Sequence, residues 1–198
     1  MKNIGLFFGS FNPIHNGHTT LAQTILEQSQ LNEIWFVVSP HNPLKHKADL
    51  LSEQQRLHMV DLAIRDIADM HSCDIEFQLP KPSYTINTLR RLSELYPEYK
   101  YTLIIGSDNL KVFHLWREYE YILRHYSIIV YPRKGDDINK LQHTYPDISI
   151  IQASLLPISS TEIRAMLKAQ PLSENPAQQW LNHDVWDYIV KNNLYTTD

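Results

Sequence analysis

The chain has 198 residues, a formal net charge of −4, and 43% hydrophobic against 20% charged residues. This balance excludes a disordered chain, and the acidic net charge argues against a protein that coats nucleic acid. Cys73 is the only cysteine, so we expect no disulfide within the chain and no cysteine-based zinc site. Because no signal-peptide core and no membrane-length apolar run is present, we expect a cytoplasmic protein that binds neither a membrane nor nucleic acid.

Short apolar runs alternate with longer segments of helical period along the chain. The runs predicted as strands are residues 3–8, 33–38, 73–78, 101–105, 126–131 and 148–151. Predicted helices cover about 51–69, with Ser52 as the capping residue, then 86–96, and a third that begins at Ser159 or Ser160, with Glu162 as the capping partner of Ser159. This alternation predicts an α/β fold: a Rossmann-like, doubly wound parallel sheet with helices on both faces and a small C-terminal helical extension.

No repeat or flexible linker divides the chain, so we expect one domain over residues 1–198. Its Rossmann-like body would span 1–158 and its C-terminal helical part 159–198. In that part Val185, Ile189 and Leu194 are expected to face inward. Residues 136–147 are predicted to form a loop and a short helix.

The turn after the first predicted strand has an unusual composition. Gly9 follows the strand directly, and Gly17 lies between His15 and His18 where the first helix opens. At a helix start the free N–H groups and the positive end of the dipole favour an anion, and residues three apart share a face. Two imidazoles there predict a triphosphate-binding turn, which a phosphate can approach closely at Gly17. The alternatives are ordinary surface histidines, or a zinc site that lacks a zincin glutamate and a third ligand, so we expect no protein-held metal.

Two other segments carry candidate ligand-binding groups. Ser159, Ser160 and Thr161 place hydroxyls at a helix start, with Arg164 on the same face, which predicts a second grip on phosphate. The alternative is a capped helix with a solvated arginine. Gly106 and Asp108 follow a predicted buried strand, where a carboxylate could bind a ribose hydroxyl or could simply cap a helix.

The run from Gly9 to His18 resembles the signature of the HIGH-type nucleotidyltransferases. Four further motifs follow in the same order as in bacterial nicotinate mononucleotide adenylyltransferases, and with the first they extend over nearly the whole chain. They are Pro40-His41-Asn42-Pro43-Leu44-Lys45, Ser83-Tyr84-Thr85-Ile86-Asn87-Thr88-Leu89, Ile105-Gly106-Ser107-Asp108 with Trp116, and Ile158-Ser159-Ser160-Thr161-Glu162-Ile163-Arg164.

The resemblance implies transfer of the adenylyl group of ATP to nicotinate mononucleotide, giving nicotinate adenine dinucleotide and pyrophosphate in NAD biosynthesis. It implies catalytic roles for His15, His18 and Arg164. ATP would be bound by Gly9, Ser10, Phe11, Gly17, Gly106, Asp108, Ser159, Ser160 and Thr161, and the mononucleotide by Lys45, Tyr84, Thr85, Trp116 and Arg133. Mg²⁺ would be held mainly through the phosphates of ATP.

Some points stay open at this stage. Trp116 could simply pack in the core, and lone basic residues such as Lys45 and Arg133 are usually solvated. Phe8 stands where family members commonly have glycine, and Asn87 where many have aspartate. The alternatives are another transferase of the same fold, such as phosphopantetheine adenylyltransferase or a cytidylyltransferase, and a non-catalytic nucleotide-binding module. A homo-oligomer is compatible with the sequence.

Overall fold

A computed structural model describes residues 1–40, 50–133 and 135–196. Six parallel strands form one sheet in the order β3-β2-β1-β4-β5-β6. The strands are β1 (Lys2–Gly9), β2 (Glu33–Val38), β3 (Met70–Cys73), β4 (Tyr99–Gly106), β5 (Ser127–Tyr131) and β6 (Ser149–Ile150). This order is that of a doubly wound Rossmann-like sheet, so the predicted fold class is confirmed.

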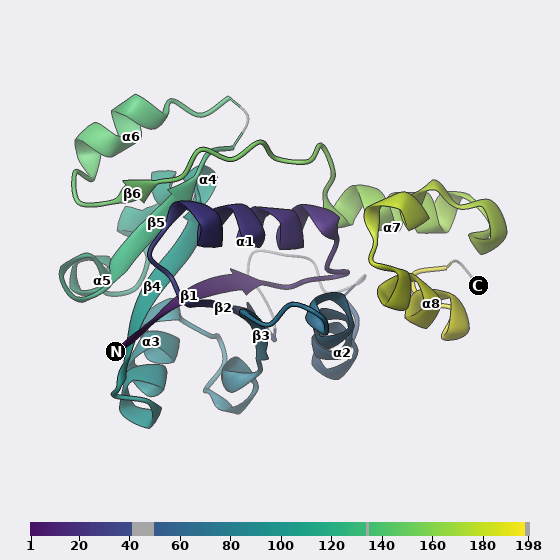
Figure 1. The fold of residues 1–198 in the computed structure, drawn as a ribbon, viewed down its shortest axis with the longest axis horizontal. Helices are drawn as coiled ribbons and strands as arrows, with labels where there is room; N and C mark the ends of the chain where they lie inside the picture. The colour runs from purple at the N-terminus through teal and green to yellow at the C-terminus, as the bar shows by residue number, and fades with distance from the viewer. Residues whose placement is uncertain (41–49, 134, 197–198) are drawn as a thin grey trace.

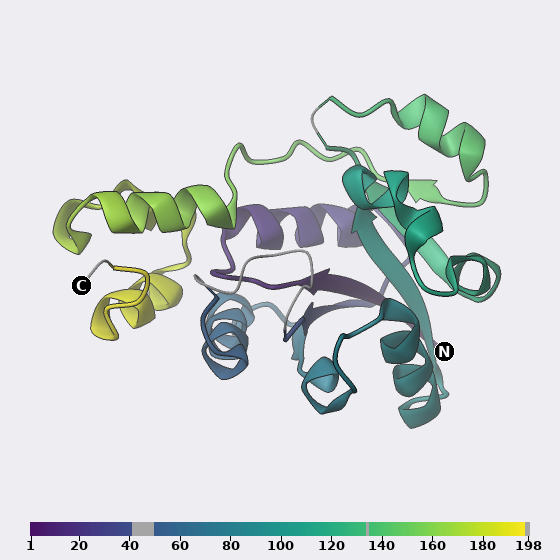
Figure 2. The ribbon, with the colours of Figure 1, turned by 180° about the vertical axis from the view of Figure 1, so that it is seen from behind.

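Helices flank the sheet on both sides, as Figure 1 shows from the front and Figure 2 from behind. The α-helices are α1 (Asn16–Gln28), α2 (Glu53–Ile64), α3 (Thr85–Leu95), α4 (Ser107–Lys111), α5 (Tyr119–His125), α6 (Ile138–Thr144), α7 (Ser160–Ala169) and α8 (His183–Lys191). Short 3-10 helices are η2 (Ile75–Gln78), η3 (Phe113–Leu115), η4 (Leu172–Glu174) and η5 (Pro176–Trp180). No helix in the described part of the chain is long and apolar enough to cross a membrane.

Alternating side chains of the strands build two hydrophobic cores, one on each face. In β2, Phe36 and Val38 enter the core beneath α1 and α2, whereas Val37 enters the core beneath α3 and α5. Because successive side chains of a strand point to opposite faces, an apolar run without alternation is expected for a strand buried on both sides. This continuous run is the signal by which the sequence predicted the strand.

The structure corrects two predicted boundaries. The predicted strand 73–78 is wrong, because the strand ends at Cys73 and residues Ile75–Gln78 form a 3-10 helix. β3 pairs with β2 alone, so a short strand with polar residues suffices at this edge of the sheet. The helix predicted to reach residue 69 ends at Ile64, whereas its N-cap, Ser52, is confirmed by a hydrogen bond from the Gln55 N–H.

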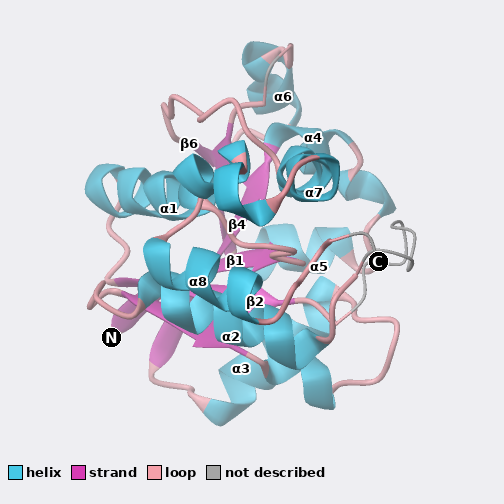
Figure 3. Ribbon diagram, turned by 90° about the vertical axis from the view of Figure 1, so that its right-hand side faces the viewer, coloured by secondary structure: helices cyan, strands magenta, loops and turns pink. Residues whose placement is uncertain are grey.

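The C-terminal helices α7 and α8 share a core with the sheet. Val185, Ile189 and Leu194 are buried as predicted, in the same cluster as Phe36 of β2. Figure 3 is viewed from the side on which both helices lie, and shows them in front of the sheet with α8 beside α2. The division of the chain at residue 158 stays a prediction.

Candidate active site

The strand order reverses its direction between β1 and β4. From β1 the chain moves to β2 on one side, and from β4 it moves to β5 on the other. The segments that leave these two strands therefore separate and open a crevice at the carboxyl edge of the sheet, which is where doubly wound sheets bind their ligands. Gly9 ends β1 and Gly106 ends β4, so both glycine-bearing turns lie at this crevice.

A cleft of about 490 Å³ lies at this edge, and we call it the first-turn cleft. It is lined by Phe7, Ser10, Asn12, His15, Gly17, His18, Leu21, Leu50, Tyr131, Arg133, Leu155, Leu156, Ile158, Ser159, Ser160, Thr161 and Arg164. The lining that the structure describes holds two arginines and two histidines and no carboxylate. A protein with a net charge of −4 thus concentrates positive groups at one place, which favours a polyanion there.

His15 and His18 lie at the start of α1, as predicted, with their rings 3.8 Å apart. The backbone N–H of His15 donates to Nδ1 of His18 at 3.2 Å. Because Nδ1 accepts this bond, the neutral His18 ring carries its proton on Nε2, and that nitrogen is a donor. The local backbone thereby selects the tautomer that can donate to a phosphate oxygen.

His15 is buried, with 7% of its surface exposed. Burial, and secondarily the charge of Arg133, lowers its pKa to about 4, so the ring is neutral near pH 7. Gly17 packs against this ring: an added Cβ would lie 2.9 Å from Nδ1 of His15. Only glycine therefore fits between the two histidines without displacing one of them.

The start of α7 is joined directly to the first turn. The hydroxyl of Ser160 donates to the carbonyl of Pro13 at 2.9 Å, and Arg164 Nη1 donates to the carbonyl of Asn12 at 2.9 Å. Figures 1 and 2 show the N-termini of α1 and α7 side by side. Two positive helix ends and the guanidinium of Arg164 thus face the same cleft.

The hydroxyls at the start of α7 have different partners. Ser159 is the N-cap: its Oγ accepts from the Glu162 N–H at 3.2 Å and donates to that residue's carboxylate at 2.7 Å. The predicted capping pair is therefore confirmed. Thr161 Oγ1 lies 3.5 Å from Arg164 Nη2. The predicted roles of these hydroxyls in binding ATP stay predictions.

The segment after β4 supplies a carboxylate, Asp108, and the segment after β5 supplies an arginine beside it, Arg133. Arg133 Nε lies 3.6 Å from Asp108 Oδ1, and Arg133 Nη2 donates to the Tyr131 hydroxyl at 3.1 Å. An added Cβ at Gly106 would lie 2.3 Å from Asp108 Oδ1 and would displace this carboxylate. Arg133 was assigned to the mononucleotide, and the structure brings it into the first-turn cleft beside His15.

Three other residues assigned to the mononucleotide lie outside this cleft, and we call Tyr84, Thr85 and Trp116 the acceptor wall. Tyr84 is the N-cap of α3 and Thr85 its first residue. Tyr84 is 39% exposed, and the guanidinium carbon of Arg117 lies 5.0 Å from the centre of its ring. Trp116 rests on Phe113, 5.1 Å away between ring centres. Lys45 lies outside the described residues.

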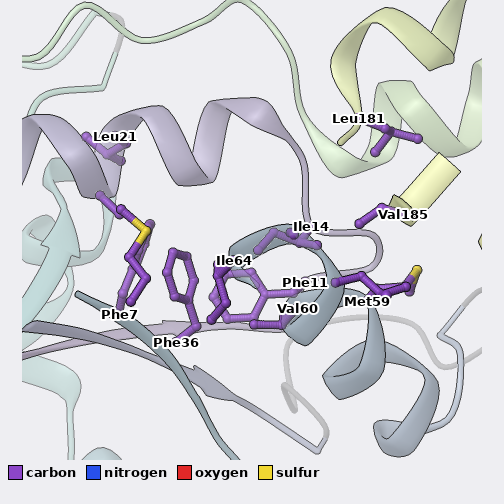
Figure 4. Close-up of a cluster of buried hydrophobic side chains, with 14 of the residues drawn as sticks. Phe7, Phe11, Ile14, Leu21, Phe36, Met59, Val60, Ile64, Leu181 and Val185 are labelled. Atoms are coloured by element: carbon purple, nitrogen blue, oxygen red, sulfur yellow. The ribbon is translucent and has the colours of Figure 1, made fainter. Parts of the chain in front are cut away.

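The Phe11 ring is buried beneath the first turn, with its centre 5.2 Å from that of the His18 ring. The side chain is 2% exposed and points into the core with Phe36 and Val60, as Figure 4 shows. Its backbone has a φ of 43°, in the left-handed region that favours glycine. Any contact of Phe11 with ATP would therefore use the main chain.

Arg56 is completely buried, and the sequence did not predict it as part of the site. Its guanidinium donates to four carbonyl oxygens, those of Ser10 (2.5 Å), Ser39 (2.8 Å), Pro40 (2.9 Å) and Leu51 (3.0 Å). It therefore holds the first turn to the end of β2 and the start of α2. The available signal was its position three and four residues before Met59 and Val60, on the buried face of α2.

Known proteins match the chain over nearly its full length. Residues 6–166 match a family model described as Cytidylyltransferase-like. A Flavobacterium johnsoniae protein named "Probable nicotinate-nucleotide adenylyltransferase" is 48% identical over 97% of this chain and 98% of that protein. A Cytophaga hutchinsonii protein of the same name is 44% identical over 98% of both. A solved structure, Plasmodium falciparum nicotinic acid mononucleotide adenylyltransferase complexed with NaAD, has the same fold, with a TM-score of 0.81 at 24% identity over 98% of each chain.

Proposed function

The chain belongs to the nicotinate-nucleotide adenylyltransferase family, and we infer that it transfers the adenylyl group of ATP to nicotinate mononucleotide in the first-turn cleft. The products are nicotinate adenine dinucleotide and pyrophosphate. The observation that carries the inference is the gathering of Arg133 with His15, His18 and Arg164 of two helix N-termini, on a lining whose described residues include no carboxylate. Such a site favours a polyphosphate.

In the proposed ATP complex, the triphosphate lies across the N-termini of α1 and α7. His18 donates to the triphosphate from Nε2. Arg164 binds the Asn12 carbonyl through Nη1 and donates to the triphosphate through its other N–H groups. The free N–H groups of both helices point to the same anion. Asp108 is placed to accept a hydrogen bond from a ribose hydroxyl. The apolar side chains of Leu156 and Ile158 give the adenine ring a surface on which to pack.

The reaction is a direct, in-line displacement at the α-phosphorus of ATP. An oxygen of the mononucleotide phosphate forms the new P–O bond while the bond to the β-phosphate oxygen breaks, and the electron pair leaves with pyrophosphate. The nucleophile is already an anion near neutral pH, so no general base is needed. The protein aligns the two phosphates and stabilises negative charge on the oxygens of the transferred and leaving groups, the roles proposed for His15, His18 and Arg164.

ATP would enter as its magnesium complex. The described residues contain no group of three His, Cys, Asp or Glu side chains that could hold a metal ion, so phosphate oxygens and water would be its main ligands. When bound, the ion neutralises part of the triphosphate charge. Arg133 and the positive end of α1 are compatible with that arrangement, since they compensate the charge that remains.

The acceptor is proposed to lie between the first-turn cleft and the acceptor wall. Trp116 presents a flat ring on which the pyridine ring can stack. The N–H groups at the start of α3, around Tyr84 and Thr85, are placed to bind a carboxylate, which would favour nicotinate over nicotinamide. Arg133 would meet the mononucleotide phosphate where it approaches the α-phosphorus, and Lys45 would neutralise that phosphate.

The cytoplasm is the proposed location. Burial raises the pKa of the Cys73 thiol to about 11, so the thiol is protonated and unreactive near neutral pH. Nothing in this residue's surroundings calls for an oxidising compartment. A homo-oligomer is compatible with the fold.

Pyrophosphate release by the purified protein tests the function. With ATP and Mg²⁺, we expect turnover with nicotinate mononucleotide, and much slower turnover with nicotinamide mononucleotide or phosphopantetheine. Turnover with phosphopantetheine alone would keep the cleft and overturn the acceptor. ATP binding without turnover of any of the three would favour a non-catalytic nucleotide-binding module.

A further inference from the structure

A tyrosine at the carboxyl end of the chain reaches the first turn. The hydroxyl of Tyr195 donates to Oδ1 of Asn12 at 2.7 Å, although the two residues are 183 positions apart. Tyr195 is 9% and Asn12 3% exposed, so the hydrogen bond is buried. The segment after α8 therefore ends against the turn on which the phosphate-binding groups are built.

Asn12 is the junction between this tyrosine and the cleft. Its Oδ1 also accepts from the Leu51 N–H at 3.3 Å, and its carbonyl oxygen accepts from Arg164 Nη1 at 2.9 Å. The side chain of Asn12 is thus held by the C-terminal segment and by the residue before the Ser52 cap of α2. Its main chain in turn holds the guanidinium proposed to bind phosphate, so a shift of Asn12 shifts Arg164.

The backbone on both sides of this contact has an uncommon conformation. Asn193 and Tyr195 have φ values of 47° and 64°, and Phe11, just before Asn12, has 43°. Non-glycine residues adopt the left-handed region at a cost in free energy and persist there only where the surroundings fix them. Leu194, which lies between Asn193 and Tyr195 in the chain, is buried and fixes this segment, and its N–H donates to the carbonyl of Ile189 at 3.0 Å.

The Tyr195 phenol remains a donor over the working range of the protein. Burial raises its pKa above the ordinary value of 10.0, and this effect outweighs the charges of Arg164 and Arg56, which act in the opposite direction. Oδ1 of Asn12 can only accept. The direction of the hydrogen bond is therefore fixed, and it does not vary with pH near neutrality.

We propose that Tyr195 is a positioning residue for adenylyl transfer, because through Asn12 it fixes the place of the Arg164 guanidinium at the ATP phosphates. The inference rests on the proposed function only in taking Arg164 as a phosphate-binding group. The C-terminal segment is in this account a part of the active site, although Tyr195 itself touches no substrate.

The test compares Tyr195→Phe with Tyr101→Phe. Tyr101 is a matched control: it is 5% exposed, its hydroxyl donates to the Leu92 carbonyl at 3.2 Å, and it lies in the core on the other face of the sheet. Both variants lose one buried hydroxyl and keep the ring, so we expect similar small losses of melting temperature. Misplacing Arg164 should weaken binding of a non-hydrolysable ATP analogue, measured by calorimetry, and lower kcat, each about tenfold, in Tyr195→Phe alone.

A second comparison separates positioning from a general loss of stability. In the background of Arg164→Ala, Tyr195→Phe should change the affinity for the analogue by less than about twofold, because its target is gone. Equal affinity and kcat in Tyr195→Phe and Tyr101→Phe, or a full effect of Tyr195→Phe without Arg164, would overturn the proposal. Calorimetry reads ATP binding alone, so this comparison decides the role of Tyr195 even if nicotinate mononucleotide proves to be the wrong acceptor.

Discussion

The first-turn cleft and the acceptor wall are built differently. In the cleft, partly buried hydrogen bonds join segments that are far apart in the chain: Arg56 to Ser10, Arg164 to Asn12 and Ser160 to Pro13. On the acceptor wall, Tyr84 is exposed, and its ring contacts the guanidinium of Arg117, which is also exposed.

The difference follows the chemistry proposed for each side. Charge moves between the α- and β-phosphates of ATP, and donors that are fixed before the reaction need no reorganisation during it. The acceptor needs to be admitted, oriented and released as a dinucleotide, which a more exposed wall allows. Preorganisation is therefore concentrated where the bonds break and form.

The largest expected effect is on stability, from replacing Arg56, which holds the first turn to β2 and α2. Arg56→Met removes the donor to four carbonyl oxygens that lie in buried or partly buried hydrogen bonds, so we expect a loss of about 3–5 kcal/mol in the free energy of unfolding, measured in urea. Arg65→Met, at the C-cap of the same helix, removes an exposed ion pair with Asp184 and should cost less than about 1 kcal/mol. Similar losses in the two variants would show that the cleft is not held by Arg56.

The next effect concerns the side chains proposed to donate hydrogen bonds to the phosphates of ATP. His18→Ala removes the Nε2–H donor and should lower kcat by a factor of about 10²–10³ while the circular dichroism spectrum stays unchanged. His125→Ala, on α5, is the control, since this exposed histidine is stacked on Tyr121. Turnover of His18→Ala near that of the wild type would contradict the assignment of the cleft.

A smaller and more selective effect is expected on the acceptor wall. Trp116→Ala should raise the KM for nicotinate mononucleotide about tenfold through the lost stacking, and leave the KM for ATP unchanged. Leu115→Ala removes the exposed neighbour, 73% accessible, and should change neither constant. If both KM values rise together in Trp116→Ala, the two sides are not separable and the comparison fails.

The smallest effect tests the support beneath that wall. Glu76 is 2% exposed, its Oε1 accepts from the Thr88 hydroxyl of α3 at 2.8 Å, and burial raises its pKa from 4.5. A carboxyl with a raised pKa stabilises the fold when protonated and costs free energy once ionised. Glu76→Gln keeps an acceptor for Thr88 without the charge, and should stabilise the protein by roughly 1 kcal/mol at neutral pH.

The sign of the Glu76 effect gives it a pH signature. The advantage of Glu76→Gln should shrink as the pH falls through the raised pKa, and vanish below 4.5, where the wild-type carboxyl is protonated in both the folded and the unfolded chain. Thermal melts across this range measure it. An advantage that persists at low pH would show that charge is not its cause.

The sequence predicted what depends on local pattern. Continuous apolar runs such as that of β2 gave the strands, and capping pairs such as Ser159 with Glu162 gave the helix starts. The histidines were found because their spacing at a helix start has a direct chemical consequence.

What the sequence could not provide is long-range pairing. No local pattern links Tyr195 to Asn12, and Arg56 looks like any helix-surface arginine until α2 is placed against the first turn. The end of β3 was misplaced for a similar reason. An edge strand pairs on one side only, so its sequence needs little hydrophobic character. The residues after β3, which include Ile75 and Phe77, are more apolar, and for this reason the strand was predicted to extend over them.

Binding of a non-hydrolysable ATP analogue to the acceptor-free protein, measured by calorimetry, tests the central comparison most directly. If the first-turn cleft is formed before the acceptor binds, the analogue binds without nicotinate mononucleotide. Its affinity is then unchanged in Trp116→Ala and falls at least tenfold in His18→Ala. Binding that requires the mononucleotide, or that is lost in Trp116→Ala and retained in His18→Ala, would contradict the account.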